Sequence, residues 1–512
     1  MNIVFQKAKW TGLGLLLALT CGAPAIADDT ELLLINPNAD TQTTPNVLLI
    51  IDSSGSMVNN SEETREIYNS TLTYAGDATP CDPNYLYWTE FKKVTPSCDA
   101  TNTQRVLKTS FVCDHATRQL EGIGIYRSAM AQYRDGSSGF FSVFLGLDTE
   151  RWQKLEDGNE TGLVECKKDR NRHGDGVDGT KLYAQRGGDV APFTDDSKEE
   201  IAWGSWPTNQ SVTMFDGNYL NYLESPIAPI LDTRINIVTN TAKAILNSID
   251  GINVGVMRFN NNQGGPVILG MQDLDTNRTA IIDTIDGIIA GGATPVSETL
   301  YEAARYWRGL PAYYGEIVNE HPTDSAALVS SNPEIYQQPV GEVCSKNFNV
   351  LLTDGQPVND DETPALVDGL PNWAATLGQA GCTGTNMGDC LDDIAAYLFE
   401  DDISTADGRQ TVTTHTIAFA DEFPYLEETA LRGGGDYFEA DDVQTLTLAL
   451  LEIVNNIQDR SLSFAAPAVA VNTFNRTRNL NDLYLTTFAA AEKVHWPGNL
   501  KKYRIADSVI VD

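Results

Sequence analysis

Short runs of consecutive apolar residues alternate with amphipathic segments over much of the chain. The runs at 46–51 (NVLLII), 253–259 (NVGVMRF) and 347–353 (NFNVLLT) are typical of strands buried on both faces of a parallel sheet. Residues 233–249 instead place apolar side chains three or four positions apart, which predicts an amphipathic helix. Further strands are predicted at 266–274, 411–420 and 435–439, and further helices at 276–289, from Pro295 to about Arg308, and at 391–401, 422–432 and 443–458.

Strands that alternate with helices predict an α/β fold with a doubly wound, mostly parallel sheet. Ligands of such sheets bind beyond the carboxyl ends of the strands, so polar residues that directly follow a strand become candidates for a site. Two helices carry candidate N-caps. We expect Asp275 or Thr276 to cap the helix at 276–289, and Asp441 or Asp442 to cap the helix at 443–458.

Three segments interrupt this alternation. Residues 58–228 scatter aromatic residues, Gly, Asp, Asn and four Cys without a long periodic segment, so we interpret them as an insertion that disulfides hold because its own core is thin. Residues 309–345 form a second, shorter insertion. Residues 461–512 show period-2 stretches such as DLYLTTFA, which predict a β-rich segment that stops inside a strand. The α/β domain is therefore expected to comprise residues 28–57 and 229–460.

Residues 1–27 have the features of a secretory signal peptide. Two lysines precede the apolar run Leu13–Leu19, and Ala25-Ile26-Ala27 supplies the small residues that a signal peptidase reads. An uncleaved anchor is the alternative, although this run is too short for a spanning helix. A lipoprotein box at Cys21 is a poor match because a threonine precedes it. No later stretch reaches the roughly 18 apolar residues of a membrane span, so the sequence predicts an exported protein whose mature chain does not cross the membrane.

Seven of the eight Cys residues lie beyond the signal peptide. In an exported protein such residues usually form disulfides, and an odd number leaves one Cys free, paired with another chain, or paired with a residue that this sequence lacks. The sequence does not give the connectivity. We favour the pair Cys382 and Cys390, which bracket a flexible polar loop. No Cys-x-x-Cys occurs, which argues against a zinc ribbon or a thiol oxidoreductase.

The chain is strongly acidic, with 35 Lys and Arg, 70 Asp and Glu, and a formal net charge of −35. Such a chain repels nucleic acid and anionic membrane surfaces, and it suits a protein that works among calcium or magnesium ions. With 42% hydrophobic residues it can bury a large core. The five His residues are scattered, and no HExxH, G-x-S-x-G or phosphate-loop motif occurs, so we expect the protein not to be an enzyme.

Five oxygen-bearing side chains form a candidate metal site. Asp52, Ser54 and Ser56 follow the first strand at alternate positions, Thr294 lies in a Gly-rich turn before a helix, and Asp354 follows another buried strand. An all-oxygen set suits a hard divalent cation, magnesium or calcium. Such a set leaves the coordination shell incomplete, and an Asp or Glu carboxylate of a partner could complete it. The alternatives are a turn network that only caps helices, and a structural ion that binds no partner.

A second calcium loop is a weaker candidate. Asp169, Asn171, Asp175 and Asp178 begin like the loop of an EF-hand, but Thr180 stands at position twelve, where a bidentate Glu is expected. Two arginines within the stretch also oppose a cation. A polar surface loop is the alternative interpretation.

The metal-site residues resemble the metal-ion-dependent adhesion site (MIDAS) of von Willebrand factor A domains, whose pattern is Asp-x-Ser-x-Ser, a distant Thr and a distant Asp. DSSGSM, GGATP and LLTDG occur in this order, each after the appropriate element. In that family the two Ser and the Thr ligate the ion directly, and the Asp residues often act through water. The resemblance implies this role for Asp52, Ser54, Ser56, Thr294 and Asp354.

A wider resemblance covers nearly the whole mature chain. An A domain interrupted just after its metal loop is similar to the PilC/PilY family of type IV pilus biogenesis factors and tip adhesins. The matching stretches are NVLLIIDSSGSM, MFDGNYLNYL, GGATPVSETLYEAARYW, NFNVLLTDGQP, THTIAFA, LRGGGDYFEADD, SFAAPAVAVNTFNR and HWPGNLKKYRI. Members of this family act in pilus assembly, surface attachment and twitching motility. They usually continue into a C-terminal β-propeller, whose start residues 461–512 would form here.

Together these features predict an exported, pilus-associated adhesin with a divalent-metal site. The resemblance implies pilus components such as minor pilins, and a surface or host ligand, as partners. It also implies a location at the cell surface or pilus tip, with passage through the periplasm. A generic exported A-domain binding module without a link to pili is the alternative. The insertion at 58–228 directly follows the metal loop, so we expect it to shape or shield the site, unless it is a tolerated surface elaboration.

Overall fold

The structure is a computed structural model of the whole chain, and part of the chain is described here. The described residues are 44–77, 79–91, 94–98, 102–134, 151–169, 183–184, 199–200, 211–226, 230–315, 321–340, 346–384, 387–406, 409–461, 468–470, 482–488, 498–506 and 509–511. The predicted signal peptide lies outside these residues. So does most of the second calcium loop, since the described residues stop at Asp169 and resume at Tyr183.

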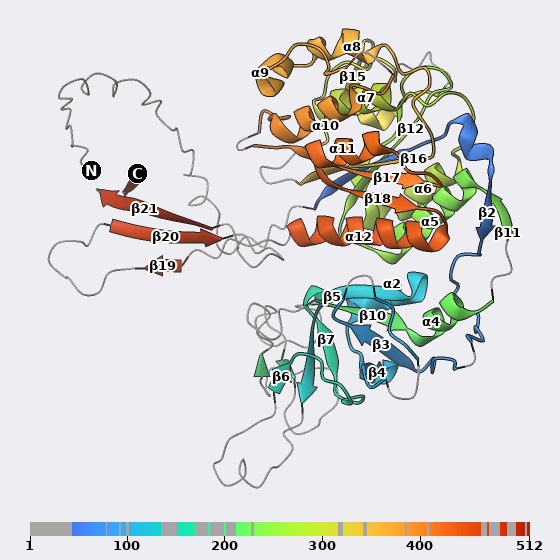
Figure 1. Cartoon of the computed structure of the whole chain (residues 1–512). Coiled ribbons are helices and arrows are strands. Elements are labelled where there is room, and N and C mark those ends of the chain that lie inside the picture. The colour runs from blue at the N-terminus through green and yellow to red at the C-terminus, as the bar shows by residue number, and fades with distance from the viewer. Residues whose placement is uncertain are drawn as a thin grey trace, which may run out of the picture. The chain divides into compact units, whose positions relative to one another are not determined.

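A six-stranded sheet forms the centre of the α/β part, with the strand order β13-β12-β1-β16-β17-β18 (Figure 1). The strands are β1 (Asn46–Ile51), β12 (Asn253–Arg258), β13 (Val267–Asp273), β16 (Asn347–Thr353), β17 (Val412–Phe419) and β18 (Gly434–Ala440). Neighbouring strands are parallel, apart from the edge pair β12 and β13, which is antiparallel. The mixed α/β class that the sequence predicts is confirmed.

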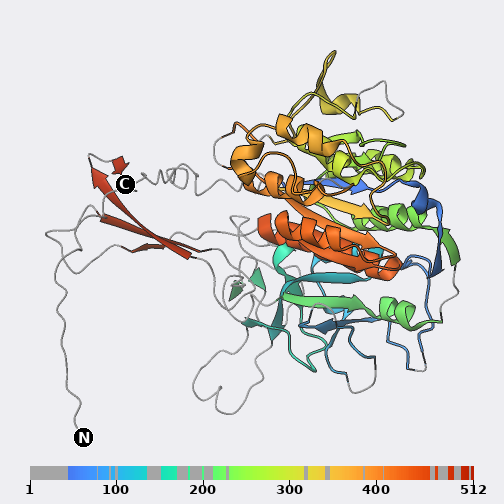
Figure 2. The ribbon, with the colours of Figure 1, turned by 45° about the horizontal axis from the view of Figure 1, so that its top comes forward.

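Two hydrophobic clusters pack on opposite faces of this sheet, because successive side chains of a strand point to opposite sides. In β1, Val47 and Ile51 belong to one cluster, whereas Leu48 and Ile50 belong to the other. The first cluster includes residues of α5 (Arg234–Ser248), α6 (Leu274–Asp286) and α12 (Val443–Ser461). The second includes residues of α7 (Val296–Trp307), α10 (Leu391–Glu400) and α11 (Pro424–Arg432). Helices therefore cover both faces, as Figure 2 shows from a second direction.

Burial on both faces explains the apolar runs in the sequence. All seven residues of β16 and all eight residues of β17 are buried. Each fully buried aliphatic side chain contributes about 1.5–3 kcal/mol relative to exposure. The polar residues that these strands do contain, such as Asn349 and Thr414, are buried too and bond to each other, with Asn349 Nδ2 donating to Thr414 Oγ1 at 3.3 Å.

One predicted helix cap is wrong. Asp273, rather than Asp275 or Thr276, caps α6, because its carboxylate accepts a hydrogen bond from the backbone N–H of Thr276 at 2.9 Å. The physical reason is that β13 continues directly into α6 without a loop, so its last residue is also the cap. At α12, Asp442 is the cap, with Thr445 N donating to Asp442 Oδ1 at 2.8 Å.

The segment between β1 and α5 contains more regular structure than its sequence indicates. β2 (Asn60–Thr64) and β11 (Ile230–Thr233) pair antiparallel and bring its two ends together. Between them lies a second sheet of order β4-β3-β10-β5-β6, with β7 paired to β5. Its strands are β3 (Tyr85–Thr89), β4 (Arg105–Leu107), β5 (Ile125–Arg134), β6 (Arg151–Gln153), β7 (Val164–Cys166) and β10 (Ser211–Asp216), and the helices are α2 (Asp114–Ile123) and α4 (Gly217–Glu224). A further short pair is β8 (Tyr183–Ala184) with β9 (Glu199–Glu200).

This segment has a hydrophobic core of its own, which is smaller than the two clusters of the central sheet. Leu86, Trp88, Tyr126, Met130 and Met214 are part of a cluster of buried residues of its own. The sequence analysis did not predict its elements, because most strands are short and because antiparallel pairing joins segments far apart in sequence. Disulfides add to this core, as expected. They join Cys81 to Cys98 and Cys113 to Cys166.

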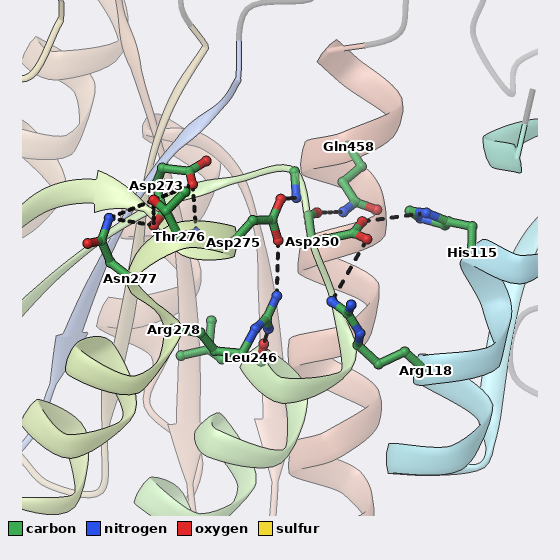
Figure 3. Close-up of polar contacts among 11 residues, drawn as sticks. His115, Arg118, Leu246, Asp250, Asp273, Asp275, Thr276, Asn277, Arg278 and Gln458 are labelled. Atoms are coloured by element: carbon green, nitrogen blue, oxygen red, sulfur yellow. Dashed lines mark hydrogen bonds and ion pairs between the residues drawn. The ribbon is translucent and has the colours of Figure 1, made fainter. Parts of the chain in front are cut away.

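Helix α2 contacts the α/β part through His115 and Arg118, which face Asp250, as Figure 3 shows. His115 Nδ1 lies 3.5 Å from Asp250 Oδ1, and Arg118 Nη1 lies 4.0 Å from Asp250 Oδ2. Asp250 follows α5, whose own C-terminal turn is held by Arg278, which donates to the carbonyl of Leu246.

The remaining elements are small. The 309–345 segment contains η4 (Ser325–Ala327), β14 (Leu328–Ser331) and β15 (Glu334–Tyr336), and the segment before α10 contains α8 (Thr363–Leu366), η5 (Val367–Gly369) and α9 (Trp373–Leu377). The C-terminal strands β19 (Ala468–Ala470), β20 (Asp482–Phe488), β21 (Gly498–Ala506) and β22 (Val509–Val511) form an antiparallel sheet in this order. Among the described residues, no helix combines the length and apolar composition that a membrane crossing requires.

Candidate metal centre

The candidate site lies where the direction of the chain reverses within the sheet. β1 and β16 are neighbours, and from them the chain order runs outward on both sides, to β12 and β13 and to β17 and β18. Open α/β sheets bind ligands at such a switch point, beyond the carboxyl ends of the strands. Asp52 directly follows β1 and Asp354 directly follows β16. Because Ile51 is paired with Leu352, these two residues leave the sheet side by side.

Asp52 is held by three hydrogen bonds. Its Oδ1 accepts from Ser54 N at 2.7 Å, and its Oδ2 accepts from Thr353 Oγ1 at 2.5 Å and from Asp354 N at 3.3 Å. The carboxylate thus fixes the turn that follows β1 and ties this turn to the end of β16.

Two serine hydroxyls extend this network to Asp354. Ser54 Oγ and Ser56 Oγ lie 2.9 Å apart, and Ser56 Oγ donates to Asp354 Oδ1 at 2.5 Å. Oxygens in neighbouring positions of an octahedron, each about 2.1 Å from Mg²⁺, are about 3.0 Å apart. The spacing of the two serine oxygens therefore matches that of neighbouring magnesium ligands, although it also equals an ordinary hydroxyl hydrogen bond.

Thr294 reaches the same place from the turn before α7. Gly291 N donates to Ser53 O at 2.7 Å, which joins this turn to the turn after β1. Gly292 adopts φ +94°, and a Cβ there would lie 2.4 Å from the Cα of Asn261, so the close approach requires glycine. At Gly355, a Cβ would lie 3.4 Å from Ser56 Oγ and 3.7 Å from Thr294 Oγ1. The Thr294 and Ser56 hydroxyls therefore border one small space.

The segment after Asp354 fixes the turn of Thr294. Thr294 and Val358 exchange two backbone hydrogen bonds of 3.1 Å. Two residues further on, Asp360 caps α7 by accepting from Ser297 N and Glu298 N, each at 3.0 Å. Hydrogen bonds thus join the two loops that supply Thr294 and Asp354.

The site is buried and carries two carboxylates, one of which, that of Asp354, contacts a guanidinium. Asp52 and Asp354 are 0% and 4% exposed, and Ser54 and Thr294 are buried as well, whereas Ser56 is half-buried. Burial and the charge of Asp354 raise the pKa of Asp52 to about 6, although hydrogen bonds from Thr353 and Ser54 act in the opposite direction. Arg234 Nη1 donates to Asp354 Oδ2 at 2.7 Å.

These residues fit a divalent cation. Their donors are hydroxyl and carboxylate oxygens, which hard cations such as magnesium and calcium prefer. Burial, and after it the charge of Asp354, disfavours the ionised form of Asp52, and a bound cation would relieve this unfavourable burial of two nearby carboxylates. Ser54, Ser56 and Thr294 would supply hydroxyl ligands, and Asp52 and Asp354 would supply negative charge.

The structure brings the five predicted residues together and adds others that the sequence analysis missed. Thr353 holds Asp52, Arg234 pairs with Asp354, and the hydroxyl of Tyr425 donates to Gly355 O at 2.6 Å. Thr353 could have been found, because it directly precedes Asp354 at the end of a predicted strand. No sequence signal marks Arg234 or Tyr425, which lie 120 and 71 positions from Asp354 along the chain.

The other predicted site residues stand apart from this centre. Cys382 is bonded to Cys390, the pair that the sequence analysis favoured. Asn171, Asp175 and Asp178 of the second calcium loop lie outside the described residues, and Asp169 ends η3 (Lys167–Asp169). A cluster of Cys113, Glu165 and Cys166 also occurs, but its two sulfurs are joined in a disulfide and are not available to a metal.

Comparisons with known proteins give one partial family match. Residues 85–225, within the segment between β2 and β11, match a family model described as a domain of unknown function (DUF8355). A comparison with curated proteins finds no match.

Several solved structures are similar in part. A von Willebrand factor type A protein from Catenulispora acidiphila is 16% identical, over 46% of this chain and 40% of that chain, with a TM-score of 0.26. The vWF domain of the type V pili tip protein Mfa5 from Porphyromonas gingivalis is 10% identical, over 47% of this chain and 92% of that chain, with a TM-score of 0.27. Proximal thread matrix protein 1 from the mussel byssus, with a zinc-occupied MIDAS motif, is 14% identical, over 46% of this chain and 44% of that chain, with a TM-score of 0.25.

This chain thus spans less than half the length of the first of these proteins. At these TM-scores the similarities carry no argument about what it binds. The case for a metal centre rests on the arrangement of its own side chains.

Proposed function

We propose that the protein is an exported adhesion module of the von Willebrand factor A type, with a doubly wound sheet and a divalent-metal site formed by Asp52, Ser54, Ser56, Thr294 and Asp354. The metal, magnesium or calcium, binds an acidic group of a partner. One observation carries this proposal. Three hydroxyls and two carboxylates from three separate loops converge at the switch point of the sheet.

The pattern of hydrogen bonds supports a binding site over a mere turn network. A turn network would leave its hydroxyls donating to backbone carbonyls, as the side chain of Ser53 does to Phe259 O. Ser54 instead contacts Ser56, and Ser56 donates to the buried carboxylate of Asp354. Buried polar side chains are costly unless they are hydrogen-bonded, and here the hydroxyls bond to one another and to a carboxylate while Ser56 and Thr294 also border one small space.

We further propose a location at the cell surface or pilus tip, with minor pilins and a surface or host ligand as partners. The signal sequence at 1–27 and the resemblance of the whole chain to type IV pilus biogenesis factors support this proposal. The net charge of −35 makes nucleic acid an unsuitable partner and favours recognition through a bound cation. On the same resemblance, the role is one of binding and not of catalysis.

The segment between β1 and α5 is proposed to shape the metal site. Its two ends lie close to the metal loop. Asn60, the first residue of β2, comes two positions after η1 (Gly55–Val58) of that loop, and Asn60 is paired with Thr233, the last residue of β11. A change in this segment would therefore reach the site through these two strands.

The test compares the wild type with Asp52→Ala in cells that produce the protein. We expect the variant to be exported and to reach sheared surface fibres, but to lose Mg²⁺- or Ca²⁺-dependent attachment. Full attachment by the variant would refute a role of the ion in adhesion. Absence of the wild type from sheared fibres would favour the alternative, a binding module not associated with pili. A hydrolase screen of the purified protein checks the expectation that it is not an enzyme.

A further inference from the structure

Arg234 is the cation that the structure places at the candidate metal centre. Its Nη1 donates to Asp354 Oδ2 at 2.7 Å, and the Asp354 side chain is fully buried. Asp354 Oδ1 accepts from Ser56 Oγ, so both oxygens of this carboxylate are engaged. A guanidinium in this position supplies part of the positive charge that a metal ion would bring.

The backbone fixes where this side chain starts. Arg234 is the first residue of α5, and its N–H donates to Asn59 O at 3.0 Å. Thr233, just before it, is paired with Asn60 in the β2–β11 ladder and caps α5 through Asn236 N. Arg234 is therefore anchored to the end of the metal loop itself, at the point where the chain returns from the insertion.

The Arg234 guanidinium is held mainly by its ion pair with Asp354, because its hydrogen bonds are incomplete. Its Nε is buried and has no hydrogen-bond partner among the described residues. A buried donor without a partner is unfavourable, so the pairing with Asp354 must offset this cost. Once another cation neutralises Asp354, that pairing weakens and little remains to hold the guanidinium in place.

We propose that Arg234 is a built-in competitor of the divalent cation, which neutralises Asp354 in the metal-free protein and gives up this contact when the metal binds. This inference rests on the proposed function, because it concerns the same site. Its consequence is that the site fills only at a higher cation concentration than its oxygen ligands alone would require. The insertion, whose closing strands position Arg234, thereby takes part in setting the threshold for adhesion.

The test measures Mn²⁺ binding to the chelator-treated full-length protein by calorimetry, together with thermal unfolding in the absence and presence of Mg²⁺. Arg234→Met removes the charge and keeps an apolar stem, and Arg234→Gln gives the same comparison if methionine prevents folding. Arg278→Met is the matched control. Arg278 contacts the carbonyl of Leu246, twelve positions along α5 from Arg234 and about 18 Å away at 1.5 Å per residue (Figure 3).

Removing a positive charge this close to the site should tighten Mn²⁺ binding roughly ten- to a hundredfold. We also expect Arg234→Met to lower the unfolding temperature of the metal-free protein and to enlarge the rise caused by Mg²⁺. Arg278→Met should bind Mn²⁺ like the wild type.

The outcomes separate the inference from the proposed function. If the wild type binds Mn²⁺ and Arg234→Met binds it equally well or more weakly, the competitor role of Arg234 is refuted, whereas the proposed metal site is not. Binding by Arg234→Met but not by the wild type would support strong competition. If neither the wild type nor any Arg234 variant binds Mn²⁺, the proposed metal site and the inference both fail.

Discussion

Glu298 provides a test of the packing beside the metal centre, because it is a fully buried carboxyl in the first turn of α7, four positions after Thr294. Its Oε2 accepts from Gly264 N at 2.8 Å, and its Oε1 accepts from Glu362 N at 3.0 Å. Burial raises the pKa of Glu298 to about 8, with a further contribution from the charge of Asp360, although the two backbone hydrogen bonds act in the opposite direction.

This pKa makes stability depend on pH. The ordinary value is 4.5, so between pH 5 and 8 the unfolded chain has released this proton while the folded protein still retains it. Because the folded state binds more protons, the free energy of unfolding falls as the pH rises through this range. One pKa unit corresponds to about 1.4 kcal/mol, and integration over the two titrations gives a loss of about 3.5 kcal/mol between pH 5 and 8.

The assay is urea unfolding at pH 5, 6, 7 and 8, with a chelator present, for the wild type and Glu298→Gln. Glutamine does not ionise, so the variant should lack this part of the pH dependence. The NH₂ group of glutamine would face one of the two backbone N–H groups that now donate to Glu298. This clash of donors should lower the free energy of unfolding by about 1–3 kcal/mol at every pH. Other titrating groups are common to both proteins and cancel in the difference. The exposed Glu400 provides the control, and Glu400→Gln should follow the wild type. If the free energy of unfolding depends on pH in the same way for the wild type and Glu298→Gln, the raised pKa of Glu298 is refuted.

Three further changes test other parts of the structure. Thr353→Val removes the hydroxyl that donates to Asp52 and should destabilise the protein by about 1.5–3 kcal/mol and weaken cation binding; Thr353→Ser should restore both, and a fully stable valine variant would contradict the role of this hydrogen bond. Replacing both Cys382 and Cys390 by serine should lower the free energy of unfolding by about 2–3 kcal/mol in thermal or urea unfolding and leave cation affinity unchanged. Asp250→Asn, which removes the partly exposed charge facing α2, should cost less than about 1 kcal/mol in the same assay, and a larger loss would mean that this contact contributes more than an exposed ion pair.

The central sheet could be predicted because burial on both faces leaves a clear trace in the sequence. NVLLII and NFNVLLT are dominated by consecutive apolar residues, and each is followed at once by a carboxylate of the site. The parallel arrangement then requires Asp52 and Asp354 to leave the sheet at the same edge. The choice of metal-site residues was therefore a consequence of topology as well as of the resemblance to a motif.

The rest depends on contacts between distant segments, which a single sequence does not reveal. In the second sheet of the insertion, β10 pairs with β3 across more than a hundred positions of chain and with β5 across more than eighty. Nothing in the sequence distinguishes Arg234 from other residues at the start of a helix, and only the fold shows that it lies beside Asp354. The cap of α6 was misplaced for a local reason, since a strand that runs straight into a helix leaves no loop to mark the boundary.

The most direct test of the central claim is the position of a bound ion. Crystals of the protein grown with Mn²⁺, measured at a wavelength where manganese scatters anomalously, would locate it without prior assumptions. We predict one strong peak bordered by the hydroxyls of Ser54, Ser56 and Thr294, with Arg234 no longer in contact with Asp354. A fully ordered site with no peak there, or a peak elsewhere while these hydroxyls keep their present contacts, would contradict the account.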